Sequence, residues 1–200
     1  MARRLTRLVV GLLLCGTGVS MMIDADLGLA PWDVLHQGIA KHTGLGIGTV
    51  AIIVGFVVLL LWLPLKERYG LGTFVNVVLI GLTIDVLLTV LPDHPPMGVR
   101  IALLVVGTLL FGPGSGYYIG VGMGAGPRDG LMTALAARGY SVRMVRTVLE
   151  VSVLVVGFAL GGSVGVGTLL FAFTIGPNVH FWLERLSLEH PEPKTVIGAE

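Results

Sequence analysis

Charged residues are scarce in this chain of 200 residues, since Asp, Glu, Lys and Arg together make up only 12% of it. An ordinary globular domain carries roughly 25%. Hydrophobic residues make up 54% of the chain, and a soluble protein of that composition could not cover its surface with polar groups. The composition therefore excludes a soluble globular protein and predicts that most of the chain lies in a lipid bilayer. The net charge of +1 and the lack of a basic patch among aromatic residues argue against a nucleic-acid partner.

Cysteine is nearly absent, and two common catalytic motifs are missing. The single cysteine, Cys15, lies in an apolar run, which excludes an intramolecular disulfide and a cysteine-based metal cluster. The sequence contains neither a Gly-x-x-x-x-Gly-Lys-Ser/Thr loop nor a His-Glu-x-x-His pair, so P-loop ATP hydrolysis and that type of zinc site are excluded. The glycine-rich run 161–165 lies at the end of an apolar stretch and is not interpreted as a nucleotide-binding loop. We expect that the protein is not an enzyme and that it binds neither a cofactor nor a metal ion.

Long apolar stretches are what the chain has in quantity. Six of them approach the roughly 20 residues that a helix needs to cross a bilayer, at about 8–23, 46–65, 71–91, 101–124, 145–161 and 164–183. The segments 31–41 and 127–138 are too short and too polar to cross, and each begins with Pro-x-Asp. Proline suits the first helical position, and aspartate complements the positive helix start. We predict an all-α integral membrane protein with six transmembrane helices and two short Pro-x-Asp helices.

The basic residues predict the orientation of this membrane protein. We assume that the short segments do not cross and that the N-terminus is cytoplasmic. All of the 13 Lys and Arg residues except Lys41 and Arg100 then lie inside, which leaves 11 on the cytoplasmic side. This is a strong positive-inside bias. We predict a multi-pass protein with both termini in the cytoplasm.

The two halves of the chain resemble each other. In positions 4–40, 14 residues recur 96 positions later: Arg4, Leu8, Val9, Val10, Gly11, Leu13, Leu14, Gly16, Gly18, Gly28, Pro31, Asp33, Leu35 and Ala40. At an offset of 95, the run 70–73 matches 165–168, and Ile80-Gly81 matches Ile175-Gly176. Each half has three predicted spans, an odd number, so the second half enters the membrane upside down. We predict a first repeat over 1–95, a second and inverted repeat over 96–186, and a polar cytoplasmic tail over 187–200. Inverted repeats with a site between them are a common plan of secondary transporters.

The Pro-x-Asp segments allow two interpretations. As re-entrant half-helices they would line a pathway, with Trp32, Asp33, His36 and Gln37 in an outer vestibule and Arg128, Asp129 and Thr133 in an inner one. As amphipathic helices they would lie flat on the membrane surface, because Trp32, Leu35 and Ile39 share one helical face. The sequence leaves both interpretations open.

Charged residues inside the apolar stretches are further candidates, because charge within a membrane is costly. Asp85 has no basic residue within four positions, and we interpret it as functional. Glu150 follows Arg146 by four residues, so an ion pair on one helix face is the favoured interpretation, and a place on the pathway is the alternative. His180 is the repeat equivalent of Asp85 and is interpreted as an interfacial residue.

Glycines at 112, 116, 120 and 124 recur every four residues. Small residues at this spacing let helix backbones approach closely, so we predict that this face packs against another helix. The alternative is that the glycines leave room for a pathway that Tyr117 and Tyr118 face.

The segment 28–38, Gly-Leu-Ala-Pro-Trp-Asp-Val-Leu-His-Gln-Gly, resembles the signature of the bacterial YczE/YyaS/YitT membrane family, YczE branch. The stretches 126–131, 145–147 with Glu150, and 161–171 fit the same branch, and the resemblance extends to about residue 186. It implies a bacterial inner-membrane protein. Some members of this family are classified as candidate exporters of antibiotic-like compounds, and the resemblance assigns no residue a role.

The leading hypothesis is a small inner-membrane transporter or permease, with export as the favoured direction and the site between the repeats. Its partners would be the lipid bilayer and an unknown small-molecule substrate. A homo-oligomer is also compatible with the sequence. The alternative is a membrane accessory or scaffold protein that serves a partner without transporting anything. An intramembrane enzyme is disfavoured because no nucleophile–base pair is visible.

Overall fold

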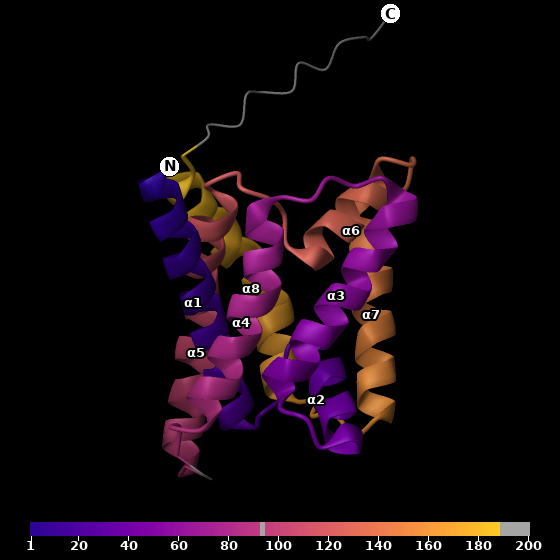
Figure 1. The fold of residues 1–200 in the computed structure, drawn as a ribbon. Coiled ribbons are helices and arrows are strands. Elements are labelled where there is room, and N and C mark those ends of the chain that lie inside the picture. The colour runs from indigo at the N-terminus through magenta and orange to yellow at the C-terminus, as the bar shows by residue number, and fades with distance from the viewer. Residues whose placement is uncertain (93–94, 189–200) are drawn as a thin grey trace, which may run out of the picture.

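The computed structural model describes residues 1–92 and 95–188, and these form eight helices and no strand (Figure 1). The predicted tail falls mostly on residues 189–200, outside the described residues. The helices are α1 (Ala2–Ala25), α2 (Pro31–Thr43), α3 (Ile47–Leu65), α4 (Leu71–Leu88), α5 (Met97–Ile119), α6 (Pro127–Ala136), α7 (Val142–Ala159) and α8 (Val166–Leu186).

Five of these helices, α1, α3, α4, α5 and α8, are long and apolar enough to cross a membrane. The chain is therefore an all-α, multi-pass membrane protein. The sixth predicted span corresponds to α7, which has 18 residues but carries Arg143, Arg146 and Glu150. Each of the five apolar helices has an 18-residue stretch with at most two charged residues, whereas α7 carries three within its 18 residues.

The prediction that the fourth span reaches residue 124 is wrong. Helix α5 ends at Ile119, and Gly122 and Gly124 adopt left-handed backbone conformations with φ of 64° and 129°. Such angles cannot continue a right-handed helix. Residues 120–126 instead form the connection to α6, so only Gly112 and Gly116 of the predicted ladder lie within the helix.

Helices α1 and α5 form the centre of one side of the molecule through close backbone contact. A Cβ added to Gly11 would lie 2.6 Å from the carbonyl oxygen of Gly114, and one added to Gly18 would lie 2.6 Å from that of Gly107. Glycine at these positions is therefore required by the approach of the two backbones. Helix α4 packs on α1, and α8 packs on α5.

The predicted glycine face of α5 does pack against another helix. Added Cβ atoms at Gly112 and Gly116 would meet the side chain of Asn178 and the backbone of Trp182, both on α8. The alternative, an open space along these glycines, does not hold there.

The short helices α2 and α6 lie at opposite ends of the other side of the molecule (Figure 1). Helix α2 packs against α7, and α6 packs against α3. The N-terminus, the α3–α4 connection and the α6–α7 connection lie at the end that carries α6, and the α1–α2 and α7–α8 connections lie at the end that carries α2. Both short helices begin with proline and carry Asp33 or Asp129 in the first turn, as predicted.

Candidate functional site

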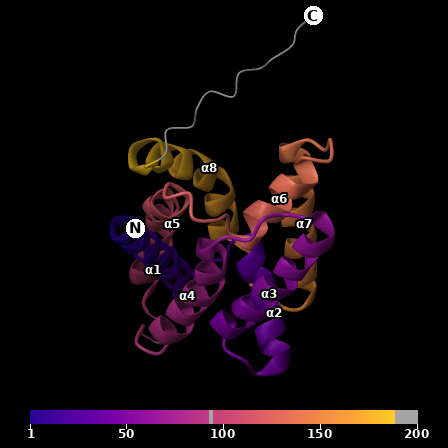
Figure 2. The same cartoon turned by 45° about the horizontal axis from the view of Figure 1, so that its top comes forward.

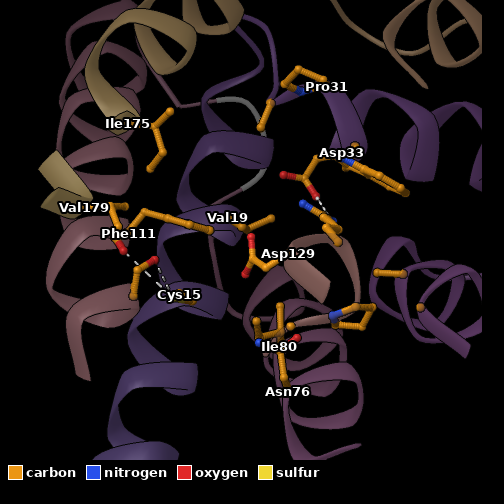
Figure 3. A pocket seen from close by; sticks show the side chains of 18 of the residues that line it. Cys15, Val19, Pro31, Asp33, Asn76, Ile80, Phe111, Asp129, Ile175 and Val179 are labelled. Atoms are coloured by element: carbon orange, nitrogen blue, oxygen red, sulfur yellow. Dashed lines mark hydrogen bonds and ion pairs between the residues drawn. The ribbon is translucent and has the colours of Figure 1, made fainter. Parts of the chain in front are cut away.

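A cavity of about 410 Å³ lies where the two sides of the molecule meet, and all eight helices contribute to its lining. Its volume falls within the range of small-molecule sites, about 300–1,000 Å³. Figure 3 shows Cys15, Val19, Phe111, Ile175 and Val179 around an apolar part, with Asp33, Asn76 and Asp129 around a polar part. The cavity thus combines an apolar wall with a few charged groups.

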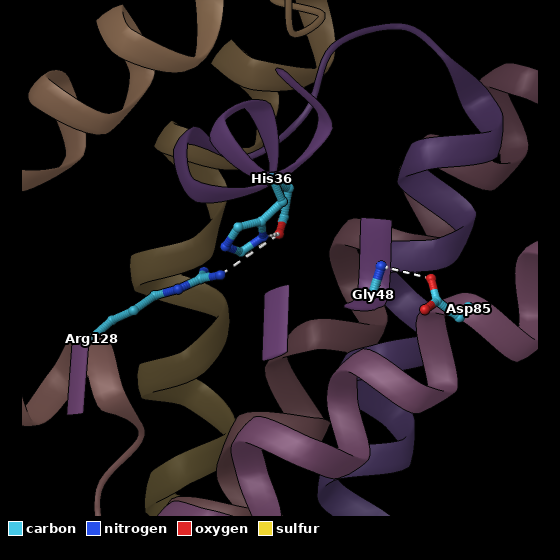
Figure 4. Close-up of polar contacts among 5 residues, drawn as sticks. His36, Gly48, Asp85 and Arg128 are labelled. Carbon is cyan, nitrogen blue, oxygen red and sulfur yellow. Dashed lines mark hydrogen bonds and ion pairs between the residues drawn. The ribbon is translucent and has the colours of Figure 1, made fainter. Parts of the chain in front are cut away.

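The first two turns of α2 and the first turn of α6 supply the polar centre. Asp33 and His36 are 5% and 2% exposed. His36 Nδ1 lies 3.3 Å from Asp33 Oδ1, and an Arg128 guanidinium nitrogen lies 3.7 Å from the same oxygen. Figure 4 shows Arg128 extending from its own helix toward this pair. Charge from one half of the chain is therefore neutralised by charge from the other.

Burial alone raises the pKa of the Asp33 carboxyl, but the hydrogen bond from His36 and the charge of Arg128 outweigh it and hold this pKa below its usual value. Burial is also the largest influence on His36, and together with Arg128 it lowers the histidine pKa despite the neighbouring carboxylate. The favoured state is thus an ionised Asp33 beside a neutral His36. In that state Nδ1–H donates to the carboxylate, and Nε2 is left as an acceptor.

Arg128 makes a second contact across the two halves. Its guanidinium carbon lies 4.9 Å from the ring centroid of Trp32, within the range of a cation–π interaction. Trp32 lines the cavity and is 6% exposed, and its indole nitrogen has no hydrogen-bond partner among the described residues. Trp32 and Arg128 occupy equivalent places at the offset of 96. Their contact therefore brings the equivalent starts of α2 and α6 together.

Asp129 differs from its repeat equivalent Asp33 in exposure and in its partners. It is exposed, and its carboxylate accepts a hydrogen bond of 2.7 Å from the Tyr118 hydroxyl. A Cβ added to Gly126 would lie 3.2 Å from Asp129 Oδ2, 3.2 Å from Tyr118 Oη and 3.6 Å from Asn76 Nδ2. These polar groups therefore gather beside the start of α6 and line the cavity.

Arg146 and Glu150 also line the cavity, from α7. Arg146 Nε donates to Glu150 Oε1 over 3.0 Å, which is the ion pair that their spacing predicts. On α8, His180 lies 3.2 Å from Glu184 in the same i,i+4 arrangement.

Four predicted pathway residues do not line the cavity. One of them, Thr133, donates its hydroxyl to the Gly130 carbonyl oxygen on its own helix over 3.0 Å. Gln37 accepts a hydrogen bond of 2.6 Å from the backbone nitrogen of Ser163 and so ties α2 to the α7–α8 connection. Tyr117 lies under the Arg7 guanidinium, with 5.7 Å between ring centroid and carbon. Asp85 accepts hydrogen bonds from Gly48 N, Thr49 N and Thr49 Oγ1 at 2.7, 2.8 and 2.6 Å. Asp85 thus caps the start of α3, as Figure 4 shows for Gly48.

The run 161–165 also fits the Gly-x-Ser-x-Gly pattern of a hydrolase nucleophile elbow. That elbow needs a strand before the serine, whereas Ser163 connects two helices. Its backbone nitrogen donates to Gln37, and its carbonyl oxygen accepts from Leu29 N. The run connects α7 to α8, and its hydrogen bonds attach this connection to α2 and to the segment that precedes α2.

Asn76, Phe111 and Ser115 are cavity residues that sequence reasoning missed. Asn76 is an amide inside an apolar stretch, and that was a usable signal. Phe111 is apolar, and Ser115 lies among the glycines of α5, so neither stands out. Within residues 1–92 and 95–188 no three His, Cys, Asp or Glu side chains gather into a metal-binding group.

Comparison with known proteins identifies relatives along nearly the whole chain. Residues 2–184 match a family described as "Family of unknown function (DUF6198)". An "Uncharacterized protein" of Haemophilus influenzae is 41% identical over 177 residues, which cover 88% of this chain and 81% of that protein. The "Uncharacterized membrane protein YczE" of Bacillus subtilis is 35% identical, over 90% of this chain and 85% of that protein.

The "Uncharacterized protein YyaS" of Bacillus subtilis is 28% identical, over 87% of this chain and 89% of that protein. No solved structure matches the chain. The family match covers more than nine-tenths of the sequence and includes every residue of the cavity. The chain therefore belongs to family DUF6198 and is a YczE- and YyaS-like membrane protein.

Proposed function

We propose that the protein is a small transporter of the bacterial inner membrane, whose substrate passes through the cavity between two inverted halves, with export as the favoured direction. The observation that carries this proposal is the polar centre formed by Asp33, His36 and Arg128. Buried charge is costly in a membrane protein, and it marks substrate or ion pathways. Here it lies inside a cavity of small-molecule size rather than within packed side chains.

Crossed pairs of contacts support the inverted arrangement of the halves. The Gly11–Gly114 and Gly107–Gly18 approaches exchange places when positions shift by 96. Gly72 N donates to Met123 O, and Gly167 N donates to Leu27 O, each at 2.8 Å. These two pairs are equivalent in the repeat, because Gly72 corresponds to Gly167 at the offset of 95 and Leu27 corresponds to Met123 at the offset of 96. Such reciprocity is expected of a two-fold axis in the membrane plane.

In this proposal α7 is the sixth span, and α2 and α6 are re-entrant half-helices. Eighteen residues give α7 a length of about 27 Å, close to the roughly 30 Å hydrocarbon core. Arg143 and Arg146 lie in its first turns, where long basic side chains reach the interface. The starts of α2 and α6 meet through Arg128, Trp32 and Asp33, which favours helices that point inward over helices that lie on the surface.

Reconstitution into proteoliposomes tests the proposal. Purified protein is first screened against a panel of small molecules for an increase in melting temperature, because a ligand that binds only the folded state stabilises it. Flux of the stabilising compounds is then compared with that of empty liposomes. Protein-dependent flux that is lost in Arg128→Ala supports transport. Absence of flux together with a stoichiometric partner after purification would favour an accessory protein instead.

A further inference from the structure

The repeat makes two helix–helix interfaces equivalent, the α3–α4 seam and the α7–α8 seam. These two seams differ in this structure. The offset of 95 relates α3 to α7 and α4 to α8. Helix α3 packs along α4, whereas α7 and α8 have no comparable contact. In Figure 2, α4 and α8 lie on one side of the molecule, and α3, α6 and α7 lie on the other. One seam is closed and its counterpart is open.

Backbone contact and hydrogen bonds close the α3–α4 seam. A Cβ added to Gly81 would meet the backbone oxygen of Gly48 and the side chain of Ile52, and one added to Gly55 would lie 2.9 Å from Val77 Cγ1. At one end, the Asp85 carboxylate on α4 accepts three hydrogen bonds from residues 48 and 49 of α3. Glycines and a capping carboxylate thus hold this seam shut.

Two of the three matching places in the α7–α8 seam hold different residue types. Gly55 corresponds to Glu150, Asp85 to His180, and Gly81 to Gly176. Among residues 1–92 and 95–188, no atom lies within 4 Å of a Cβ added to Gly176. Glu150 and His180 each pair within their own helix, and His180 is 76% exposed. Neither makes a contact across the seam like that of Asp85.

The central cavity reaches this open seam. Arg146 and Glu150 line it from α7, and Ile175, Gly176 and Val179 line it from α8. Both helices also expose apolar side chains, with Val155 on α7 and Phe173 on α8 as examples. In a membrane such side chains meet lipid, so the seam connects the cavity to the bilayer.

We propose that the α7–α8 seam is a lateral portal through which a zwitterionic amphiphile enters the cavity from the membrane; this inference rests on the proposed transport function. The apolar body would lie against Phe111, Ile175 and Val179. The head group would meet charges of both signs, because three carboxylates and two guanidinium groups line the cavity: Asp33, Asp129, Glu150, Arg128 and Arg146. Such a set suits a molecule that itself carries both charges.

The test uses two probes that share a phosphocholine head group. A fluorescent lysophosphatidylcholine carries the apolar chain, and radiolabelled glycerophosphocholine does not. In proteoliposomes, loss of lysolipid fluorescence to an external membrane-impermeant quencher reports transfer between leaflets. We expect wild-type protein to accelerate transfer of the lysolipid and to leave glycerophosphocholine unmoved.

Two tryptophan variants separate the portal from general damage. Gly176→Trp fills the seam and should slow lysolipid transfer at least fivefold. Gly98→Trp is the matched control and should leave transfer unchanged. A Cβ at Gly98 also meets no atom of the described residues within 4 Å, and Gly98 lies outside the cavity lining. Equal melting temperatures establish that both variants fold.

Several outcomes overturn the portal. One is unchanged transfer in a folded Gly176→Trp variant. Another is protein-dependent movement of glycerophosphocholine without the lysolipid, which leaves transport standing but removes membrane entry. If neither probe moves, the inference is overturned. Flux measurements on the small-molecule panel then decide the transport proposal. A disulfide-linked dimer of Gly176→Cys in a Cys15→Ala background would show that a second copy covers the seam.

Discussion

The two Pro-x-Asp aspartates occupy equivalent sequence positions but have different surroundings. Asp33 is buried against His36 and Arg128, whereas Asp129 is exposed and bonded to Tyr118. Because an internal repeat is not chemically symmetric, the shared sequence pattern alone could not reveal this difference. It follows that the same substitution should have different effects at the two sites.

We expect Asp33→Asn to destabilise the protein by about 1–3 kcal/mol, the usual cost of an unmet buried polar interaction. Asp129→Asn should leave stability nearly unchanged, because its side chain is exposed. Both should lower flux per folded molecule if the aspartates face substrate. Chemical unfolding in detergent and flux in proteoliposomes measure the two effects. Normal flux in both variants would remove these carboxylates from the pathway.

Asp85 shows why a charge in a span can be misjudged from sequence. No basic residue lies near it in sequence, yet its carboxylate is satisfied by backbone N–H groups and a hydroxyl at the start of α3. These partners come from 36 and 37 residues away, and local spacing cannot reveal them. The geometry accounts for Asp85 as a capping residue that joins two helices.

Asp85→Ala should therefore lower stability by about 1–2 kcal/mol, as the loss of a helix cap does. Asp85→Asn should lower it less, because asparagine still accepts a hydrogen bond. Flux per folded molecule should be unchanged in both variants. Thermal unfolding and flux at several pH values provide the check. Loss of pH-dependent flux in a fully stable Asp85→Asn protein would instead assign this carboxylate to proton coupling.

At the scale of elements, the sequence predicts where helices form better than it predicts where they end or what surrounds them. Long apolar runs and Pro-x-Asp starts located the helices, because length, hydrophobicity and capping act locally. The sequence predicts an end for α5 that is too late, at residue 124. The helix ends earlier because Gly122 and Gly124 adopt left-handed conformations within an apolar, glycine-rich run. The orientation of α2 and α6 was also undetermined, because a short amphipathic segment is compatible with a surface or a buried position.

The close approach of α1 and α5 gives the sharpest prediction about packing. Gly107→Leu should sharply reduce folded yield, because a Cβ at this position would lie 2.6 Å from the carbonyl oxygen of Gly18, and backbone cannot yield as a flexible side chain does. Gly98→Leu on the same helix should express like wild type. Yield after size-exclusion chromatography is the measurement. Wild-type yield for Gly107→Leu would show that this face meets lipid.

At the scale of the whole molecule, charge distribution and helix packing bear on the same topology. The N-terminus and the α3–α4 connection lie at one end of the structure, and the α1–α2 connection lies at the other. Arg100 at that second end is held by Asp26, with 3.1 Å between their charged atoms. Arg100 is one of the two basic residues that the predicted topology places outside. The predicted topology requires this grouping of the connections, and the assignment of the N-terminal end to the cytoplasm stays a prediction from the basic residues.

Cysteine labelling in intact cells tests this topology directly. In a Cys15→Ala background, Met97→Cys should react with a membrane-impermeant maleimide from outside, because residue 97 begins α5 at the end that carries α2. Lys66→Cys should react only after the membrane is opened, because residue 66 lies in the α3–α4 connection at the opposite end. Both positions are at helix boundaries, so neither substitution should disturb packing within the bundle. Labelling of both cysteines from the same side would mean that α4 does not cross, and the inverted repeat would fail with it.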